Sequence, residues 1–234
     1  MASSVLDFVS DTLIALFHLV TLSAFRPLST SAPKLEDRKM VNIVIVGGSF
    51  SAVGTAHRIF QKAAKTPNLA PFKITLVSRD SHFYWNLAAT RATILGKISD
   101  DEIFHSIPEG FAKYGEKFEF VLGSATEIDT DAKTLLVAAA DGAEPKGIGY
   151  DVLILATGTH TKADSPYKSK GSTEATKEAL HQLQARVEEA KTVVVAGAGP
   201  TGVELTGELA SGYKGTKKII LVRPNQASGW RISC

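Results

Sequence analysis

The chain has 234 residues, of which 44% are apolar and 21% charged, with a net charge of +2. This is the composition of a globular protein with one or two domains, and it excludes a disordered tail, a collagen-like fibre and a multi-span membrane protein. Balanced charge without long like-charged runs argues against a nucleic-acid partner, and a single cysteine, Cys234, excludes a disulfide framework and a cysteine-ligated zinc site.

Residues 1–40 differ in composition from the rest of the chain. Residues 5–25 are mostly apolar, and on a helical period Leu13 and Leu16 share one face while Asp7 and Asp11 lie on another. The uninterrupted apolar run is shorter than the roughly 20 residues that span a bilayer. We therefore expect a helix that binds a membrane surface; a cleaved targeting peptide and a plain packing helix are the alternatives. The linker after it is rich in Ser, Pro and charge.

A strand, a glycine turn and a helix are expected next. Residues 41–46 form a β-branched run with the length of a buried parallel strand, and residues 52–65 have a helical pattern. Between them, GGSFSA resembles the fingerprint in which a helix N-terminus binds the pyrophosphate of a dinucleotide. Serine replaces its second glycine and alanine its third, so a turn without a ligand is the alternative. The candidate binding residues are Gly47, Gly48, Ser49, Phe50 and Ala52.

The second strand is expected at residues 73–77, and the position after it commonly carries a carboxylate that holds the ribose hydroxyls. Here Ser78 occupies that position and offers a weaker hydrogen bond. Asp80 would replace the carboxylate if the turn curls back toward the ribose.

The middle of the chain has the pattern of a β-meander. Three short strand-like runs, at residues 119–122, 125–128 and 134–138, are separated by Gly and Asp residues. A buried strand at residues 150–156 follows. Small residues at its carboxyl end would let a cofactor approach the backbone. The candidates there are Ala156, Thr157 and Gly158.

A second fingerprint follows a helix that is expected at residues 173–190 with Ser172 as its N-cap. A strand at residues 192–196 leads into GAGPTG, which has all three glycines at the required spacing. Arg223 follows the next strand, where it would either accept the 2′-phosphate of NADPH or point into solvent. Residues 225–234 show no strand or helix pattern. The candidate residues of the second site are Gly197, Gly199, Pro200, Gly202 and Glu204.

Together the two units resemble the flavoproteins of the pyridine nucleotide-disulfide oxidoreductase superfamily. Residues 76–92 are similar to its apoptosis-inducing-factor-like branch, which includes the ferroptosis suppressor proteins. This resemblance implies FAD on the first unit and NAD(P)H on the second. It also implies a membrane-associated enzyme. As a separate expectation, the compartment is the mitochondrion, with the cytoplasm as the alternative. The match rests on Phe83, Asn86, Ala88, Ala89, Arg91 and Ala92, of which Asn86 and Arg91 become candidate cofactor-binding residues.

Disulfide reductases of this superfamily pass electrons from the flavin to a cysteine pair, which this chain lacks. We therefore expect an NAD(P)H oxidoreductase whose electrons pass to a quinone or another small-molecule acceptor, with no metal. The sequence identifies no catalytic residue. A non-catalytic nucleotide-binding remnant and, less favoured, a flavin monooxygenase are the alternatives.

The expected fold is α/β, with two Rossmann-like units behind an apolar N-terminal helix. Residues 1–40 would form the leader and linker, residues 41–160 an FAD-binding domain with a β-meander, and residues 161–234 the start of an NAD(P)-binding domain. Superfamily members continue past the second fingerprint, so we expect a C-terminally truncated chain that lacks the strand completing its first sheet. An open sheet edge of this kind would weaken FAD binding and favour aggregation.

Overall fold

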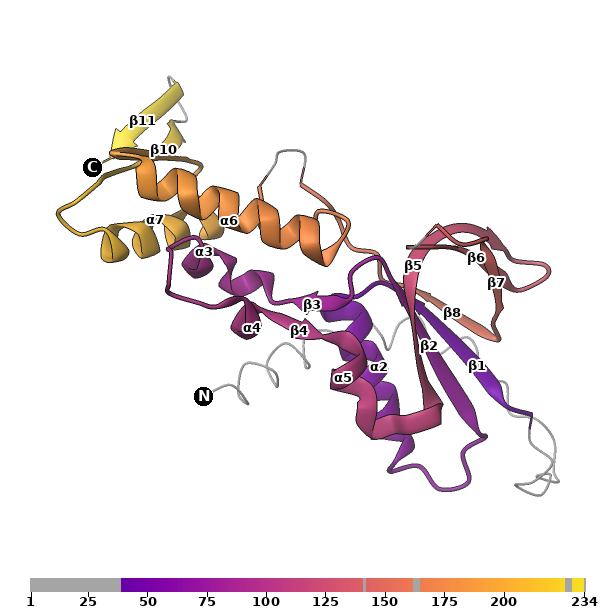
Figure 1. Cartoon of the computed structure of the whole chain (residues 1–234). Helices are drawn as coiled ribbons and strands as arrows, with labels where there is room; N and C mark the ends of the chain where they lie inside the picture. The colour runs from indigo at the N-terminus through magenta and orange to yellow at the C-terminus, as the bar shows by residue number, and fades with distance from the viewer. Residues whose placement is uncertain (1–38, 141, 162–164, 226–228, 234) are drawn as a thin grey trace. The chain divides into compact units, whose positions relative to one another are not determined.

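The computed structural model describes residues 39–140, 142–161, 165–225 and 229–233 (Figure 1). Among these, residues 39–40 and 57–71 belong to one compact unit and all others to a second, larger unit. The expected leader helix at residues 5–25 lies outside the described residues. None of the described helices combines the length and the apolar character that a bilayer span requires.

Helix α2 (Phe50–Ala63) begins in the larger unit and ends in the smaller one. It starts two residues earlier than expected, because the carbonyl of Ser49 already accepts a hydrogen bond from the Val53 N–H at 2.9 Å. In the smaller unit, the Thr66 hydroxyl donates to the Lys62 carbonyl at 2.9 Å and closes the last turn of the helix. The first turn of the helix carries no acidic side chain.

The larger unit has an α/β fold with a mixed six-stranded sheet in the order β7-β6-β5-β2-β1-β8. Strands β5, β2, β1 and β8 are parallel, whereas β6 and β7 are antiparallel additions beyond β5. Because Val46 pairs with both Val77 and Leu155, the carboxyl ends of β1, β2 and β8 meet at one edge of the sheet. The strands are β1 (Val41–Val46), β2 (Phe72–Ser78), β5 (Phe118–Asp129), β6 (Thr134–Ala139), β7 (Lys146–Gly149) and β8 (Val152–Leu155).

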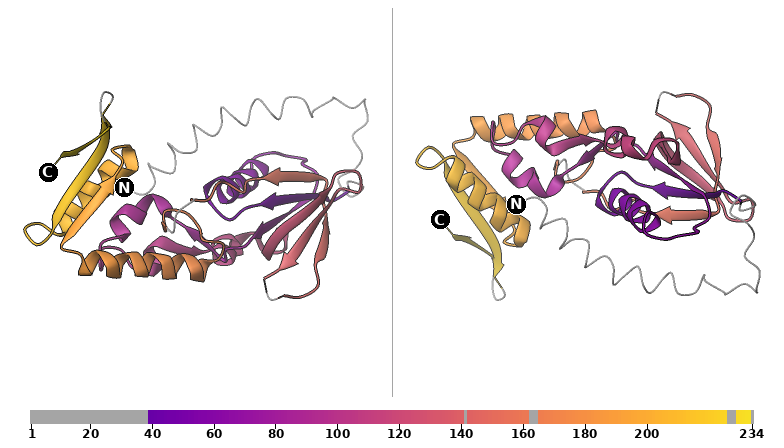
Figure 2. Two further views of the ribbon diagram at one scale, coloured as in Figure 1. Left: turned by 90° about the horizontal axis from the view of Figure 1, so that it is seen from above. Right: turned by 90° about the horizontal axis from the view of Figure 1, so that it is seen from below.

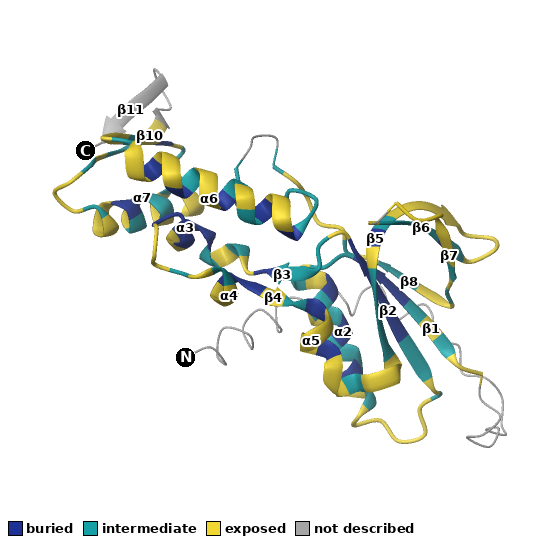
Figure 3. Ribbon diagram, viewed as in Figure 1, coloured by how far each residue is buried: buried dark blue, intermediate teal, exposed yellow. Residues whose placement is uncertain are grey.

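The centres of β1 and β2 are buried, whereas β8 lies at the open edge of the sheet (Figure 3). Leu155, the last residue of β8, is 61% exposed. A buried cluster on the sheet joins the parallel part to the meander, because it contains Val44 and Val77 as well as Leu135 and Val137.

The expectation of a strand break at Gly123 was wrong. Residues 118–129 form the single strand β5, which pairs with β2 at its start and with β6 at its end (Figure 2). A Cβ atom at Gly123 would lie 2.6 Å from the Ala138 carbonyl oxygen, so glycine permits the close approach of β6 rather than a turn. The irregularity falls instead between Ala125 and Glu127, as a shift in register. Strand β7 was not predicted.

A hairpin that was also not predicted lies between β2 and β5. Its strands β3 (His82–Tyr84) and β4 (Phe104–Ser106) pair antiparallel, although several short helices separate them in the chain. Elements of three to six residues are too short to produce a recognisable hydrophobic period. The helices of this segment are η2 (Asn86–Ala88), α3 (Ala89–Ala92), α4 (Asp100–Ile103), α5 (Ile107–Phe111) and η3 (Ala112–Lys117).

A second sheet, in the order β11-β10-β9, follows helix α6 (Thr173–Glu189). The predicted cap is confirmed, because the Ser172 hydroxyl accepts a hydrogen bond from the Ala175 N–H at 3.1 Å. The expectation of a tail without a strand was wrong: β11 pairs with β10 through its backbone, which needs no alternating side-chain pattern. The remaining elements are β9 (Thr192–Ala196), α7 (Pro200–Gly212), β10 (Lys218–Asn225) and β11 (Gly229–Ser233).

Candidate functional site

The first glycine turn leaves β1 at the edge where the strand ends meet. Gly47 has a φ of +136°, and its N–H donates to the Val77 carbonyl at 2.8 Å. A Cβ atom at this position would collide with the carbonyl group of Ala156. Both the positive φ and the close backbone contact require glycine here.

In the next positions of the turn, Gly48 and Ala52 pack against the protein interior, whereas Ser49 faces solvent. A Cβ atom on Gly48 would collide with the Ser78 hydroxyl, and Ala52 is fully buried beneath the turn. Ser49 is exposed and Phe50 is half-buried. The backbone N–H groups of the first turn of α2 therefore face no acidic neighbour on their own helix and suit an anion such as a pyrophosphate.

The carboxyl end of β8 lies beside this turn. The Ala156 N–H donates to the Val46 carbonyl at 2.8 Å, which places Ala156 next to Gly47. Thr157 and Gly158 are exposed, and Gly158 has a φ of +67°. The structure thus brings the two predicted small-residue segments of the first site together.

Ser78 and Asp80, at the end of β2, are engaged within the protein. Ser78 is 5% exposed, and its hydroxyl accepts a hydrogen bond from the Asp80 N–H at 3.0 Å. The Ser169 hydroxyl lies 2.8 Å from both carboxylate oxygens of Asp80. The turn therefore curls back toward Ser78, and the Asp80 carboxylate is directed at the segment before α6.

Burial raises the pKa of Asp80, and the hydrogen bond from Ser169 only partly opposes that effect. Because the pKa of Asp80 is higher in the folded chain than in the unfolded chain, this group favours folding at low pH. Its contribution is lost as the pH rises through the folded pKa.

We expect Asp80→Asn to raise the urea midpoint at about pH 7, with the difference shrinking toward about pH 4. Asp131→Asn, at an exposed turn, is the control. A lower midpoint for Asp80→Asn at pH 7 would contradict this prediction.

Asn86 and Arg91 make contacts outside the first turn. The Asn86 amide donates to the Tyr167 carbonyl at 2.9 Å. The Arg91 guanidinium pairs with Glu208 of α7, with nitrogen–oxygen distances of 2.9 and 2.8 Å. This hydrogen-bonded pair raises the pKa of Arg91, to which Glu204 also contributes. Arg91 therefore lies beside helix α7, which follows the second glycine turn, near the predicted site residue Glu204.

The second glycine turn repeats the geometry of the first. Gly197 has a φ of +120°, and its N–H donates to the Val222 carbonyl at 2.8 Å. A Cβ atom on Gly202 would collide with the Gly197 carbonyl oxygen. Gly199 precedes α7, with Pro200 in its first turn, and a Cβ atom on Gly199 would meet nothing within 4 Å. The turn is therefore tightly packed at Gly202 and open at Gly199, where a phosphate would approach.

The sequence profile of the pyridine nucleotide-disulphide oxidoreductases matches residues 41–226, which include both glycine turns. The chain belongs to this family. The resemblance drawn from the motifs is thereby confirmed at the level of the family.

This oxidoreductase-family chain is 53% identical over 184 residues to oxidoreductase ptaL of Pestalotiopsis fici, an alignment that covers 78% of the chain and 49% of ptaL. Ferroptosis suppressor protein 1 of Homo sapiens is 26% identical over 192 residues, covering 80% of the chain and 45% of that protein. This match confirms a distant homology to the apoptosis-inducing-factor-like branch. The chain spans about half the length of these curated relatives.

Among solved structures, NDH2 from Plasmodium falciparum in complex with NADH has a similar fold, with a TM-score of 0.58 and 20% sequence identity. The alignment covers 75% of this chain and 38% of NDH2.

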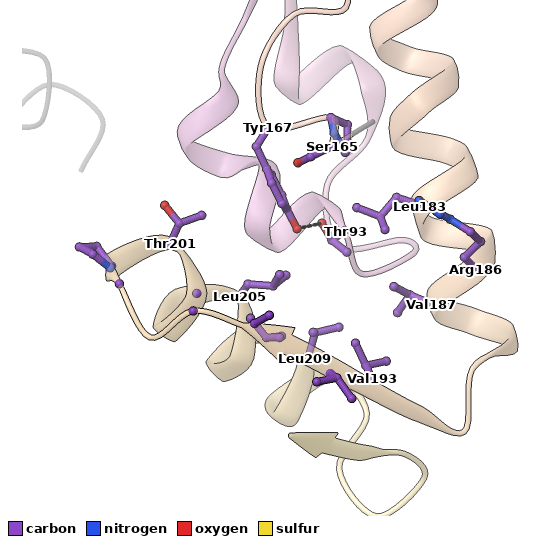
Figure 4. Close-up of a pocket in the computed structure, with 18 residues that line it drawn as sticks. Thr93, Ser165, Tyr167, Leu183, Arg186, Val187, Val193, Thr201, Leu205 and Leu209 are labelled. Carbon is purple, nitrogen blue, oxygen red and sulfur yellow. Dashed lines mark hydrogen bonds between the residues drawn. The ribbon is translucent and has the colours of Figure 1, made fainter. Parts of the chain in front are cut away.

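A cavity of about 670 Å³ lies beside the second glycine turn of the chain (Figure 4). Gly199 of the turn and Arg186 of α6 are among the residues that line it. Thr93 and Tyr167, whose hydroxyls are 3.2 Å apart, come from the hairpin segment and the loop before α6. The side chains of Thr93, Tyr167 and Arg186 were not predicted as site residues, because none belongs to a motif and only the tertiary fold brings them together. Arg223 lies within β10 rather than after it, and its side chain is exposed.

Among the described residues, no group of three or more His, Cys, Asp or Glu side chains could hold a metal ion.

Proposed function

We propose that this chain carries the dinucleotide-binding part of an FAD-dependent NAD(P)H oxidoreductase that passes electrons to a quinone-like acceptor. The observation that supports it is the repeated geometry of the two turns. Each begins at a glycine with positive φ after a parallel strand, and each opens into a helix. We assign the first unit to FAD and the second to NAD(P)H, as two Rossmann-like units.

In this proposal the chain's own groups bind and orient the nucleotides. The backbone around Gly47 and Ser49 would hold the pyrophosphate of FAD, and the backbone around Gly197 and Gly199 that of NAD(P)H. Bound FAD supplies the chemistry that accepts a hydride from the nicotinamide. The positions of the backbone N–H groups would fix where each cofactor lies, which is the main contribution of a protein to such a transfer.

The cysteine content supports an acceptor other than a disulfide within the FAD-binding unit. Residues 41–160 contain no cysteine, so the FAD-binding unit offers no thiol pair that the flavin could reduce. An acceptor outside this unit is consistent with that composition, and we propose a small molecule such as a quinone.

The experiment is an anaerobic titration of the purified chain. We expect the apoprotein to take up FAD with a change in flavin fluorescence, and the visible absorbance of the bound flavin to bleach when NADH or NADPH is added. Adding a short-chain quinone should restore the absorbance. A chain that does not bind FAD would contradict the proposal.

The second candidate is a chain that binds a nucleotide without turnover. Exposed sheet edges support it, because an open edge would weaken FAD binding. Among the described strands, β8 and β9 each end a sheet, and Leu155 and Val194 on them are 61% and 57% exposed. The same titration separates the candidates: NAD(P)H binding without bleaching of a bound flavin would favour this reading.

We further propose that residues 5–25 hold the chain at a membrane surface, where a lipid-soluble quinone is available. We expect deletion of residues 1–33 to move the protein from the membrane pellet to the supernatant without changing the Kd for FAD. The assay is co-sedimentation with liposomes. Full-length chain that remains in the supernatant would contradict the proposed anchor. We separately propose a mitochondrial location, with the cytoplasm as the alternative.

A further inference from the structure

The aromatic residue of the first glycine turn is held by a ring from the hairpin. Phe50 is the first residue of α2 and the fourth residue of the GGSFSA turn. Its ring meets that of Phe83 edge to face, with centroids 4.8 Å apart and planes at 76°. Both rings are half-buried, so each covers apolar surface of the other.

The hairpin presents two different faces. Phe83 lies opposite His105 in the β3–β4 ladder, with the two rings stacked at 6.3 Å. Because successive strand residues point to opposite faces, Tyr84 and Phe104 point away from Phe83. They stack on each other at 4.7 Å and join the buried cluster that contains Leu180 of α6. The Phe83 face of the hairpin therefore contacts the glycine turn, and the Tyr84 and Phe104 side chains lie on the opposite face.

A second residue of the same segment, Ile107, lies close to the turn. Ile107, which follows β4, is 2% exposed, and its terminal methyl would lie 3.1 Å from a Cβ atom on Gly48. The Ile107 N–H donates to the Ser81 carbonyl at 3.1 Å, which fixes the hairpin base. The hairpin segment thus contacts Phe50 through Phe83 and leaves little room for a side chain at Gly48.

We infer that Phe83 is a positioning residue for the dinucleotide-binding turn. By holding Phe50, it fixes the first turn of α2 before the ligand arrives, so the phosphate-binding N–H groups need not be ordered on binding. This inference rests on the proposed assignment of FAD to the first turn. Without the Phe83 ring, FAD binding must itself order the turn, and the Kd rises.

The test compares two substitutions in the full chain. Phe83→Leu removes the ring on the turn face of the hairpin, and Phe104→Leu removes a ring on the opposite face. We expect Phe83→Leu to raise the Kd for FAD about 3- to 10-fold, measured by flavin fluorescence. We expect Phe104→Leu to lower the melting temperature at least as much, but to change the Kd for FAD less than about twofold.

Two further measurements separate positioning from general destabilisation. The Kd for NADH should be the same in Phe83→Leu and in the wild type, and Phe83→Tyr should restore FAD affinity because it keeps the ring. Wild-type affinity in Phe83→Leu, or equal losses in both leucine variants, would overturn this inference alone. A wild-type chain that does not bind FAD would overturn the proposed function as well.

Discussion

Gly47→Ala should abolish FAD binding and lower the free energy of unfolding by about 3 kcal/mol or more. The methyl group would be placed on a residue with a φ of +136° and would collide with the Ala156 carbonyl group. Relief of that collision requires β1 and β8 to separate at the edge where the strand ends meet. Urea unfolding of the apoprotein measures the first effect, and a flavin fluorescence titration measures the second.

Gly54→Ala is the matched control for this substitution. Gly54 lies in the same helix, α2, and a Cβ atom there would meet nothing within 4 Å. We expect it to leave FAD binding unchanged and to stabilise the chain by about 0.5–1 kcal/mol, because alanine has the higher helix propensity. Equal effects of the two substitutions would show that the turn geometry of Gly47 does not matter.

Gly202→Ala should disrupt the second glycine turn as Gly47→Ala disrupts the first. Its Cβ atom would collide with the Gly197 carbonyl oxygen and lie 3.6 Å from the Val195 side chain. The turn and the first part of α7 would have to move apart, at a cost of about 1–3 kcal/mol. We therefore expect NAD(P)H binding, measured by isothermal titration calorimetry, to be lost while FAD binding is retained.

Gly207→Ala provides the control within α7, because a Cβ atom there meets nothing within 4 Å. It should leave both affinities unchanged. Together with Gly47→Ala, the pair tests whether the two turns bind different ligands. If Gly202→Ala reduced FAD binding as strongly as NAD(P)H binding, the assignment of one nucleotide to each unit would be wrong.

The strands that lead into the turns could be predicted from the sequence. β1 and β9 begin and end where they were expected, because each is a short, mostly apolar run that stops at a glycine. Helix α6 was located by its cap, Ser172. Both glycine turns follow from the same local signals, since their conformation depends on a few consecutive residues and the strand before them.

Contacts between distant segments could not be predicted. Arg91 was a candidate cofactor-binding residue, yet in the fold it pairs with Glu208, 117 residues away. The hairpin strands are three residues each, and their pairing depends on burial of Tyr84 and Phe104 against α6. Strand β5 was divided in two because glycine often ends a strand, whereas here it admits a close neighbour. Such outcomes are set by packing, which a local pattern does not encode.

The pairing of β8 with β1 has a consequence for how the protein folds during synthesis. The Asn42 N–H bonds to the carboxylate of Asp151, 109 residues further along the chain. Closing so long a loop is entropically unfavourable, whereas the β5–β6–β7 hairpins close locally. A ribosome that adds 5–20 residues per second needs roughly 5–20 s to make that intervening segment. Gly47 acquires its neighbour Ala156 only after this delay, so the first turn reaches its final shape well after its own residues have left the ribosome.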